Sequence, residues 1–190
     1  RTLEEDTALL EKEGCDVLFA PQNEEMYPET PILQFHFGNL EKTMEGKFRS
    51  GHFNGVGLIV SKFLNIVAPD RAYFGQKDIQ QFFIVKQLIK DLSFPVELRR
   101  IPTLREPDGL ALSSRNLRLT PALRKKAPLM YIALKEAGAL LKKQKPVEEI
   151  KTFVKELFLD DKDFKLEYFE LADGNSLGII DHAPKKGEVF

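Results

Sequence analysis

With 190 residues, the chain can bury the core of one large domain or of two small ones, and 43% hydrophobic and 30% charged residues indicate an ordinary globular protein. The formal net charge of −1 at pH 7 excludes a general attraction to nucleic acid, so any anion must be bound by local placement of charge. No apolar run approaches the roughly 20 residues of a membrane span, and no signal peptide is visible. The single cysteine, Cys15, lies at the start of a predicted strand, which favours a buried, inert thiol in a reducing compartment. We therefore expect a cytoplasmic protein with no nucleic-acid or membrane partner.

Hydrophobic periodicity predicts alternating strands and helices before residue 103. After a helix that ends at Gly14, the continuous apolar run at 16–20 is typical of a buried parallel strand, and the alternation at 31–37 predicts a second strand. The elements that follow are a helix at 53–67, a strand at 72–74, a helix at 78–92 and a strand at 95–101. This order is a βαβαβ unit, and right-handed crossovers make its sheet parallel. We predict an α/β fold built on a Rossmann-like parallel sheet.

Two prolines, Pro102 and Pro107, mark a domain boundary. Beyond it, the apolar spacing predicts helices at 121–143 and 147–159 and a strand at 165–172. We therefore assign residues 1–103 to the Rossmann-like domain and residues 104–190 to a small α+β domain.

The stretch Tyr-Phe-Gly-Gln-Lys-Asp-Ile-Gln-Gln at 73–81 predicts a strand that breaks at Gly75 and restarts as a helix near Asp78. Gly75 lacks a Cβ, which permits an unusual φ and lets a ligand approach the backbone. Asp78 is a good N-cap type, and the free amides of a helix start favour an anion, to which Lys77 adds a positive charge. One turn on, Gln81 faces the same mouth. On spacing alone, an alternative stays open: a simple turn with a solvated lysine and a capping aspartate.

Residues 104–116 form a polar, turn-rich loop. The hydroxyls of Ser113 and Ser114 and the guanidinium of Arg115 suit phosphate oxygens. The same residues are equally suited to cap the helix predicted to start near Pro121.

A further polar stretch, Arg-Ser-Gly-His-Phe at 49–53, begins the first crossover helix. We expect the two helix N-termini, at 51–52 and 77–78, to point to the same edge of the sheet.

Four stretches carry a resemblance: Met-Tyr-Pro at 26–28, the Arg-Ser-Gly-His-Phe stretch at 49–53, the strand–helix stretch at 74–81, and Arg-Glu-Pro-Asp-Gly-Leu-Ala-Leu-Ser-Ser-Arg-Asn at 105–116. In order and spacing they closely resemble the pantoate–β-alanine ligase family, and the resemblance runs from the first residue to the last. It implies an ATP-dependent ligase of the nucleotidyltransferase superfamily. Such enzymes activate pantoate as pantoyl adenylate with release of pyrophosphate, and β-alanine then attacks the acyl carbon to give pantothenate and AMP.

The resemblance also implies roles for individual residues. Lys77 would contact the phosphates and act in catalysis, Asp78 would lie toward the ribose, and Gln81 falls on the family's pantoate-binding glutamine. The remaining ATP-binding positions are Gly75, Gln76, Leu104, Leu112, Ser113, Ser114 and Arg115. Residue 104 and the 112–115 stretch belong to a segment that closes over the triphosphate from the C-terminal lid domain. No protein nucleophile is required, because catalysis rests on positioning and on electrostatic stabilisation of the pentacovalent phosphorus.

The cofactors and partners expected from this resemblance are small. ATP is a substrate, and Mg²⁺ would travel with it, because no carboxylate cluster in the sequence must bind a metal. The other partners are pantoate and β-alanine, and the family suggests a homodimer.

The sequence departs from the family pattern in several places. The family has a His-x-Gly-His-like phosphate motif and a second pantoate-binding glutamine in its N-terminal half, and His36, His52 and His182 stand in no such motif. Ser50 replaces a usual proline, and Leu112 replaces a common methionine of nearly equal volume. Because the chain also starts without Met, we expect a fragment, the C-terminal two-thirds of the enzyme, that cannot turn over by itself.

Three alternatives remain open from the sequence. The missing histidine motif favours a non-catalytic nucleotide-binding module. Another adenylate-forming enzyme of the same superfamily would be indifferent to pantoate. In a purely structural interpretation, a fragment that lacks strands exposes an apolar edge and associates.

Overall fold

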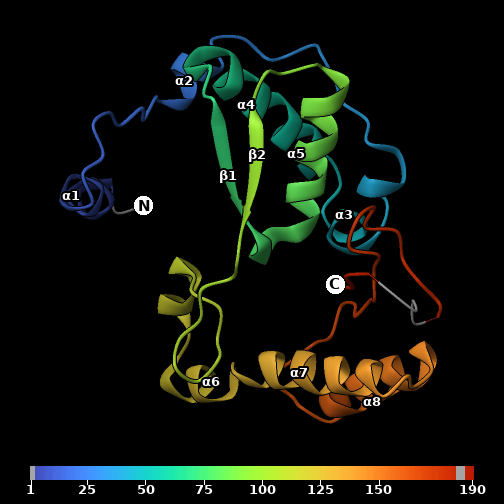
Figure 1. The fold of residues 1–190 in the computed structure, drawn as a ribbon. Coiled ribbons are helices and arrows are strands. Elements are labelled where there is room, and N and C mark those ends of the chain that lie inside the picture. Colours follow the sequence, from blue (N-terminus) through green and yellow to red (C-terminus); the bar gives the residue numbers. More distant parts are fainter. Residues whose placement is uncertain (1–2, 183–186) are drawn as a thin grey trace. The chain divides into compact units, whose positions relative to one another are not determined.

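The computed structural model describes residues 3–182 and 187–190, and the chain divides into two compact units, residues 1–34 and 35–190 (Figure 1). Among the helices of the described residues, none has the length and apolarity needed to cross a membrane.

The helices described in the first unit are α1 (Leu3–Lys12) and α2 (Asn23–Met26). The strand predicted at 16–20 is wrong: these residues form neither a strand nor a bridge with any described residue, and Val17 is 79% exposed. An apolar run becomes a strand only where a neighbouring backbone completes its hydrogen bonds, and the run itself carries no information about that neighbour. The predicted buried thiol is also wrong, because Cys15 is exposed and its Sγ donates to the carbonyl of Val17 at 3.3 Å.

The strand predicted at 31–37 is wrong as well. Residues 31–37 are irregular and lead into a short 3-10 helix, η1 (Gly38–Glu41). Instead of pairing with a strand, the amide of Phe35 donates to Oδ1 of Asn54 at 2.8 Å. A side chain of the following helix therefore satisfies a backbone group that a strand neighbour would have satisfied.

The remaining elements predicted before residue 103 are confirmed. They are α4 (His52–Val67), β1 (Arg71–Gly75), α5 (Ile79–Asp91) and β2 (Glu97–Ile101), with two short additions, α3 (Met44–Phe48) and the 3-10 turn η2 (Gln76–Asp78). As predicted, the sheet is parallel: β1 pairs with β2 in a register that runs from Arg71↔Glu97 to Gly75↔Ile101 (Figure 1). The carboxyl ends of both strands therefore meet at one edge, from which η2 and the chain after Ile101 both depart.

One apolar cluster holds α4 and α5 against the two strands. Its buried members are Phe53, Val56, Ile84 and Val85, and Phe74 of β1 and Leu98 of β2 pack against them. The helical spacing of these apolar residues explains why both segments are helices, since each places one stripe toward the strands. Burial of each such side chain contributes roughly 1.5–3 kcal/mol.

In the described residues of the C-terminal half the helical segments are η3 (Ser114–Arg118), α6 (Pro121–Lys126), α7 (Leu129–Lys142) and α8 (Val147–Leu159). The single helix predicted at 121–143 is wrong, because Pro128 separates it into α6 and α7. Proline has no N–H to continue the helix and clashes with the preceding turn. The helix predicted at 147–159 is confirmed as α8.

The core of this half forms between α7, α8 and the returning chain. Ala133 and Ala137 of α7 lie against Ile150 and Val154 of α8, and Leu171 completes the cluster. Figure 1 shows α7 and α8 side by side. The strand predicted at 165–172 is wrong over most of its length: only residue 172 takes part in a bridge, to residue 179.

Gln80 ties the start of α5 to the segment before α4. It is 4% exposed, its Oε1 accepts from the amide of Glu45 at 3.0 Å, and its Nε2 donates to the carbonyls of Leu40 and Thr43 at 2.7 and 2.9 Å. Because a buried amide costs free energy unless it is hydrogen-bonded, these three bonds fix the rotation of α5 and the position of α3 together.

Replacing Gln80 by leucine is expected to lower the free energy of unfolding by roughly 2–4 kcal/mol, because three backbone groups lose their partner. Gln87→Leu on the same helix is the matched control: Gln87 only bonds Asp91 at 2.7–2.8 Å near the surface, so a change within about 0.5 kcal/mol is expected. Urea unfolding followed by circular dichroism measures both. Equal urea midpoints for Gln80→Leu and Gln87→Leu would contradict the conclusion that the hydrogen bonds of Gln80 fix α5 and α3.

Candidate functional site

The candidate site is built on the turn between β1 and α5. Gly75 does not use the unusual φ that a glycine permits, because the residue is extended with φ −73° and ψ 136°. A Cβ built at this position would meet no atom closer than the amide nitrogen of Lys77 at 4.0 Å. The glycine is therefore not needed for its backbone conformation, but it leaves open space beside the strand end, as close approach of a ligand requires.

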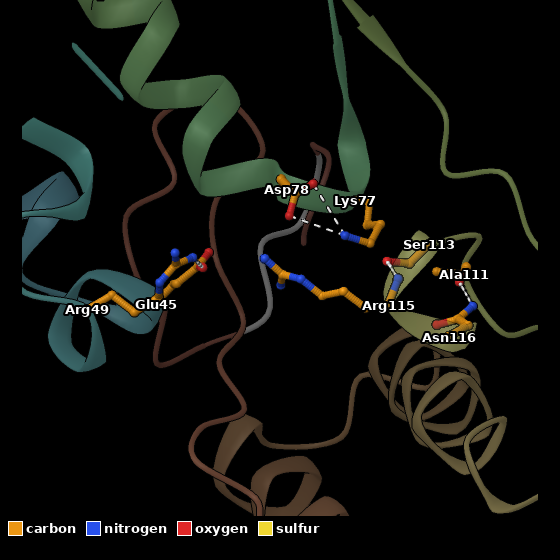
Figure 2. A network of polar contacts seen from close by, with 8 residues as sticks. All are labelled: Glu45, Arg49, Lys77, Asp78, Ala111, Ser113, Arg115 and Asn116. Carbon is orange, nitrogen blue, oxygen red and sulfur yellow. Dashed lines mark hydrogen bonds and ion pairs between the residues drawn. The ribbon is translucent and has the colours of Figure 1, made fainter. Parts of the chain in front are cut away.

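Lys77 and Asp78, two and three residues after this glycine, form an ion pair. The ammonium lies 3.4 Å from both carboxylate oxygens (Figure 2). Asp78 occupies the N-cap position of α5 as predicted, but its side chain accepts no capping hydrogen bond from the helix amides. The side chains are 37% and 55% exposed, and such a pair contributes only about 0–1 kcal/mol, so Lys77 is available to a stronger anion. Gln81, one turn on, is half-buried.

The second candidate segment is a hairpin followed by a turn. The amide of Leu112 donates to the carbonyl of Leu104 at 2.9 Å, and these two leucines are 47% and 69% exposed. Two of the predicted ATP-binding residues therefore lie opposite each other on the hairpin, as an exposed apolar pair.

Ser113 ends the hairpin and begins η3. Its Oγ accepts from the amide of Arg115 at 3.2 Å (Figure 2). The alternative role as the cap of the next helix is wrong, because Thr120 caps α6 by accepting from the amide of Leu123 at 3.3 Å. Ser114 and Arg115 are exposed, and within the described part of the chain no hydrogen bond or ion pair engages the guanidinium of Arg115. In the view of Figure 2 this side chain runs past Lys77, and its guanidinium lies between the Lys77–Asp78 pair and the Glu45–Arg49 pair.

A pocket of about 720 Å³ lies beside the strand ends. Gln76 and Lys77 line it together with Thr103 and Arg105, while most of its remaining surface comes from α7 and the returning chain. The other predicted site residues are not part of its lining. Because both strands end at the same edge, η2 and the chain after β2 can reach one space.

A group of charged residues at the start of α4 faces the same region. Arg49 and Glu45 form an ion pair on one turn of chain (Figure 2), and His52 begins the helix. Partial burial lowers the pKa of the His52 imidazole, and the Arg49 guanidinium lowers it further, while Glu45 and Asp78 act in the opposite direction. Asp78 at the start of α5 thus acts electrostatically on His52 at the start of α4.

Three contributors were missed from the sequence: Glu45, Arg105 as a pocket residue, and Tyr131 of α7. Arg105 could have been found from the sequence, because it follows closely after the end of β2. Glu45 and Tyr131 could not, because they lie on helices for which the sequence shows no motif. No group of three or more His, Cys, Asp or Glu that could hold a metal ion is found in residues 3–182 and 187–190.

Comparison with known families decides what this arrangement belongs to. A family described as pantoate-beta-alanine ligase matches residues 1–188. The chain belongs to this family. Its curated relatives include a pantothenate synthetase of Caldicellulosiruptor bescii, 46% identical over 181 residues, and one of Bacteroides fragilis, 44% identical over 187 residues. These matches cover 95% and 96% of this chain and 64% of each relative, so the chain spans less than two-thirds of their length.

Solved structures of the family have the same fold. The pantothenate synthetase of Thermus thermophilus superposes with a TM-score of 0.90 at 42% identity, over 96% of this chain and 66% of that chain. The pantoate-beta-alanine ligase of Francisella tularensis, complexed with beta-gamma ATP and beta-alanine, superposes with a TM-score of 0.69 at 34% identity, over 83% of this chain and 59% of that chain. The predicted α/β fold, a partial Rossmann-like sheet of the nucleotidyltransferase type, is therefore confirmed.

In this family member, the pKa of His52 is expected to lie below 6.5, because burial and Arg49 disfavour the imidazolium. The unfolded chain then binds the proton more tightly, so stability contributed by neutral His52 is present above pH 6.5 and is lost as the pH falls through the folded pKa. Titration of the imidazole by NMR measures the pKa, with His52→Gln used to assign the signal. Arg49→Gln should raise the value; a wild-type pKa at or above 6.5 would contradict the prediction.

Proposed function

We propose that this chain supplies the ATP-binding part, and a portion of the pantoate-binding part, of an ATP-dependent pantoate–β-alanine ligase. A carboxylate oxygen of pantoate attacks the α-phosphorus of ATP, and the bond to pyrophosphate breaks. The amine of β-alanine then attacks the acyl carbon of pantoyl adenylate, loses a proton and displaces AMP. The observation that carries the proposal is the placement of Lys77 at the strand end, with the guanidinium of Arg115, unpaired among the described residues, beside the Lys77–Asp78 pair in the view of Figure 2.

The two cations divide the charge of the triphosphate. Lys77 leaves its weak pair with Asp78 for the phosphates, and Arg115 approaches from the lid segment with a fork of donors that matches phosphate oxygens. The amides at the start of α5, which the Asp78 side chain does not cap, add donors on the same side. Fixed positive groups of this kind stabilise charge that develops on the pentacovalent phosphorus and the leaving pyrophosphate.

Neutral residues orient the substrates in this proposal. Leu104 and Leu112 offer an apolar surface to the adenine, and Asp78, once released by Lys77, can bond the ribose. Gln81 donates to and accepts from pantoate, in line with its position one turn into α5. Gln76, Ser113 and Ser114 complete the phosphate contacts, and Gly75 leaves room for them.

Mg²⁺ would be carried by the ATP phosphates. The described residues provide no cluster of three metal-binding side chains, and a magnesium ion that keeps its waters and binds through phosphate oxygens needs no such cluster. When bound, the ion would share the phosphate charge with Lys77 and Arg115.

The wider setting is also part of the proposal. Residues 1–103 would act as the nucleotide-binding domain and residues 104–190 as the lid, in a cytoplasmic homodimeric enzyme. None of His36, His52 and His182 stands in a His-x-Gly-His motif, so the histidine that acts on the phosphates would come from a segment that this chain does not carry. The same observation favours the second candidate, a nucleotide-binding module without catalysis.

Pyrophosphate release from ATP with pantoate and β-alanine tests the proposal, in this chain and in a version extended at its N-terminus with the family segment that carries the histidine motif. Activity is expected only in the extended protein. Lys77→Ala should lower kcat by about 100-fold or more, since a fixed charge on the phosphates is lost. Lys90→Ala, on the exposed surface of α5, is the matched control and should keep full activity. An extended protein that binds ATP but releases no pyrophosphate with pantoate would leave only the nucleotide-binding module.

A further inference from the structure

The hairpin that precedes Ser113 is closed by its own backbone. The amide of Glu106 donates to the carbonyl of Leu110 at 2.8 Å, the amide of Gly109 donates back to the carbonyl of Glu106 at 2.8 Å, and residues 105 and 111 form an antiparallel bridge. Oδ1 of Asp108 accepts from the amide of Leu110 at 3.1 Å. The turn is therefore one fixed shape rather than a loose loop.

Tyr131 of α7 holds this hairpin from outside. The guanidinium carbon of Arg105 lies 4.0 Å from the centre of the Tyr131 ring, and Nη1 of Arg105 donates to the carbonyl of Gly109 at 3.1 Å. Gly109 has φ +95°, and a Cβ there would lie 2.2 Å from Cδ1 of Tyr131. The ring thus packs directly on the backbone of the turn and on the cation that crosses it.

A second contact attaches the hairpin to α6. Oδ2 of Asp108 pairs with Nη1 of Arg124, and this guanidinium keeps the pKa of the Asp108 carboxyl below its usual range. Both attachments lead to helices of the C-terminal half, so the hairpin is fixed to that half and not to the strands.

The fixed shape continues into the phosphate-binding segment. Nδ2 of Asn116 donates to the carbonyl of Ala111 at 2.9 Å, and the amides of Arg115 and Asn116 donate to Oγ and the carbonyl of Ser113 at 3.2 and 3.0 Å (Figure 2). Because residue 111 is the bridge partner of residue 105, the orientation of Ser113 and Arg115 follows from the position of Arg105.

Tyr131 is not part of the core that holds α7 to α8. That core takes Ala133 and Ala137 from α7, together with the partly buried Leu129, Leu140 and Leu141, whereas Tyr131 is half-buried and faces the hairpin. Its contacts serve the hairpin rather than the packing of the two helices.

We infer that Tyr131 is a positioning residue for phosphate binding, which acts through Arg105 and Gly109 to set the orientation of Ser113, Ser114 and Arg115. The inference rests on the proposed ATP site. Arg105 also lines the pocket with Lys77, but its guanidinium is already engaged by the Tyr131 ring and by the carbonyl of Gly109. A segment held in its binding orientation before the ligand arrives loses less conformational freedom on binding.

Binding of a non-hydrolysable ATP analogue with Mg²⁺, measured by calorimetry on the 190-residue chain, tests the inference. Tyr131→Leu is expected to weaken binding about tenfold, because the ring face under Arg105 is lost. Tyr131→Phe should restore wild-type affinity, since it keeps the ring. Phe164→Leu is the matched control: Phe164 packs edge-on against Phe158 at 5.6 Å in the same half, so it disturbs the helical core without touching the hairpin.

Hydrogen exchange without nucleotide separates this inference from the proposed function. The amides of residues 115 and 116 should exchange faster in Tyr131→Leu than in wild type, Tyr131→Phe or Phe164→Leu. The positioning role is overturned if those amides keep wild-type exchange in Tyr131→Leu, or if Phe164→Leu speeds their exchange equally. If the wild-type chain binds no nucleotide, the proposed ATP site fails, while the exchange rates still decide whether Tyr131 fixes the segment.

Discussion

Parallel pairing of β1 with β2 is the constraint on which the rest of the candidate site depends. It brings Gly75 and Ile101 to the same edge, and two separate pieces of chain leave the sheet there. One piece turns directly into α5 and presents Lys77; the other leads through residue 103 into the hairpin that ends at Ser113. A shift of this register by one residue would turn every side chain of a strand to the opposite face and would separate Phe74 and Leu98 from the core they share.

The two pieces of chain are held in place by different interactions. The strand-side piece is held by burial, since Gln80 bonds three backbone groups and α5 cannot rotate without breaking them. The piece that contains the hairpin is held near the surface by a ring, a guanidinium and one charged pair, which are individually weak. One piece of the candidate site is therefore fixed by buried hydrogen bonds, and the other by several surface contacts that act together.

The sequence was most informative where periodicity and packing agree. The apolar stripes of α4 and α5, the parallel order and the turn at Gly75 could all be predicted, because each follows from spacing that only one element type satisfies. Residues 16–20 and 31–37 could not, since an apolar or alternating run shows readiness to pair but not the presence of a partner strand. Pro128 shows the opposite case: the residue that divides 121–143 was visible, and the apolar periodicity on either side outweighed it.

Within the site, neighbouring residues of one type were the hardest to separate. Gln80 and Gln81 differ by one step of a helix, about 100° of rotation, and the sequence does not give the phase that buries the first and leaves the second half-buried. The sequence likewise does not show which helix the Ser113 hydroxyl caps; in the structure it caps η3, and not α6. Contacts such as Arg105 on Tyr131 join residues far apart in the chain, and no local pattern marks them.

The exposed leucines at 104 and 112 have a thermodynamic consequence. They lie opposite each other on the hairpin, and water covers much of both side chains. A purine placed on them would remove apolar surface from water, so association would carry a negative change in heat capacity, whereas contacts with phosphates alone bury little apolar surface. The temperature dependence of the binding enthalpy would therefore distinguish contacts with the base from contacts with the phosphates at the proposed nucleotide site.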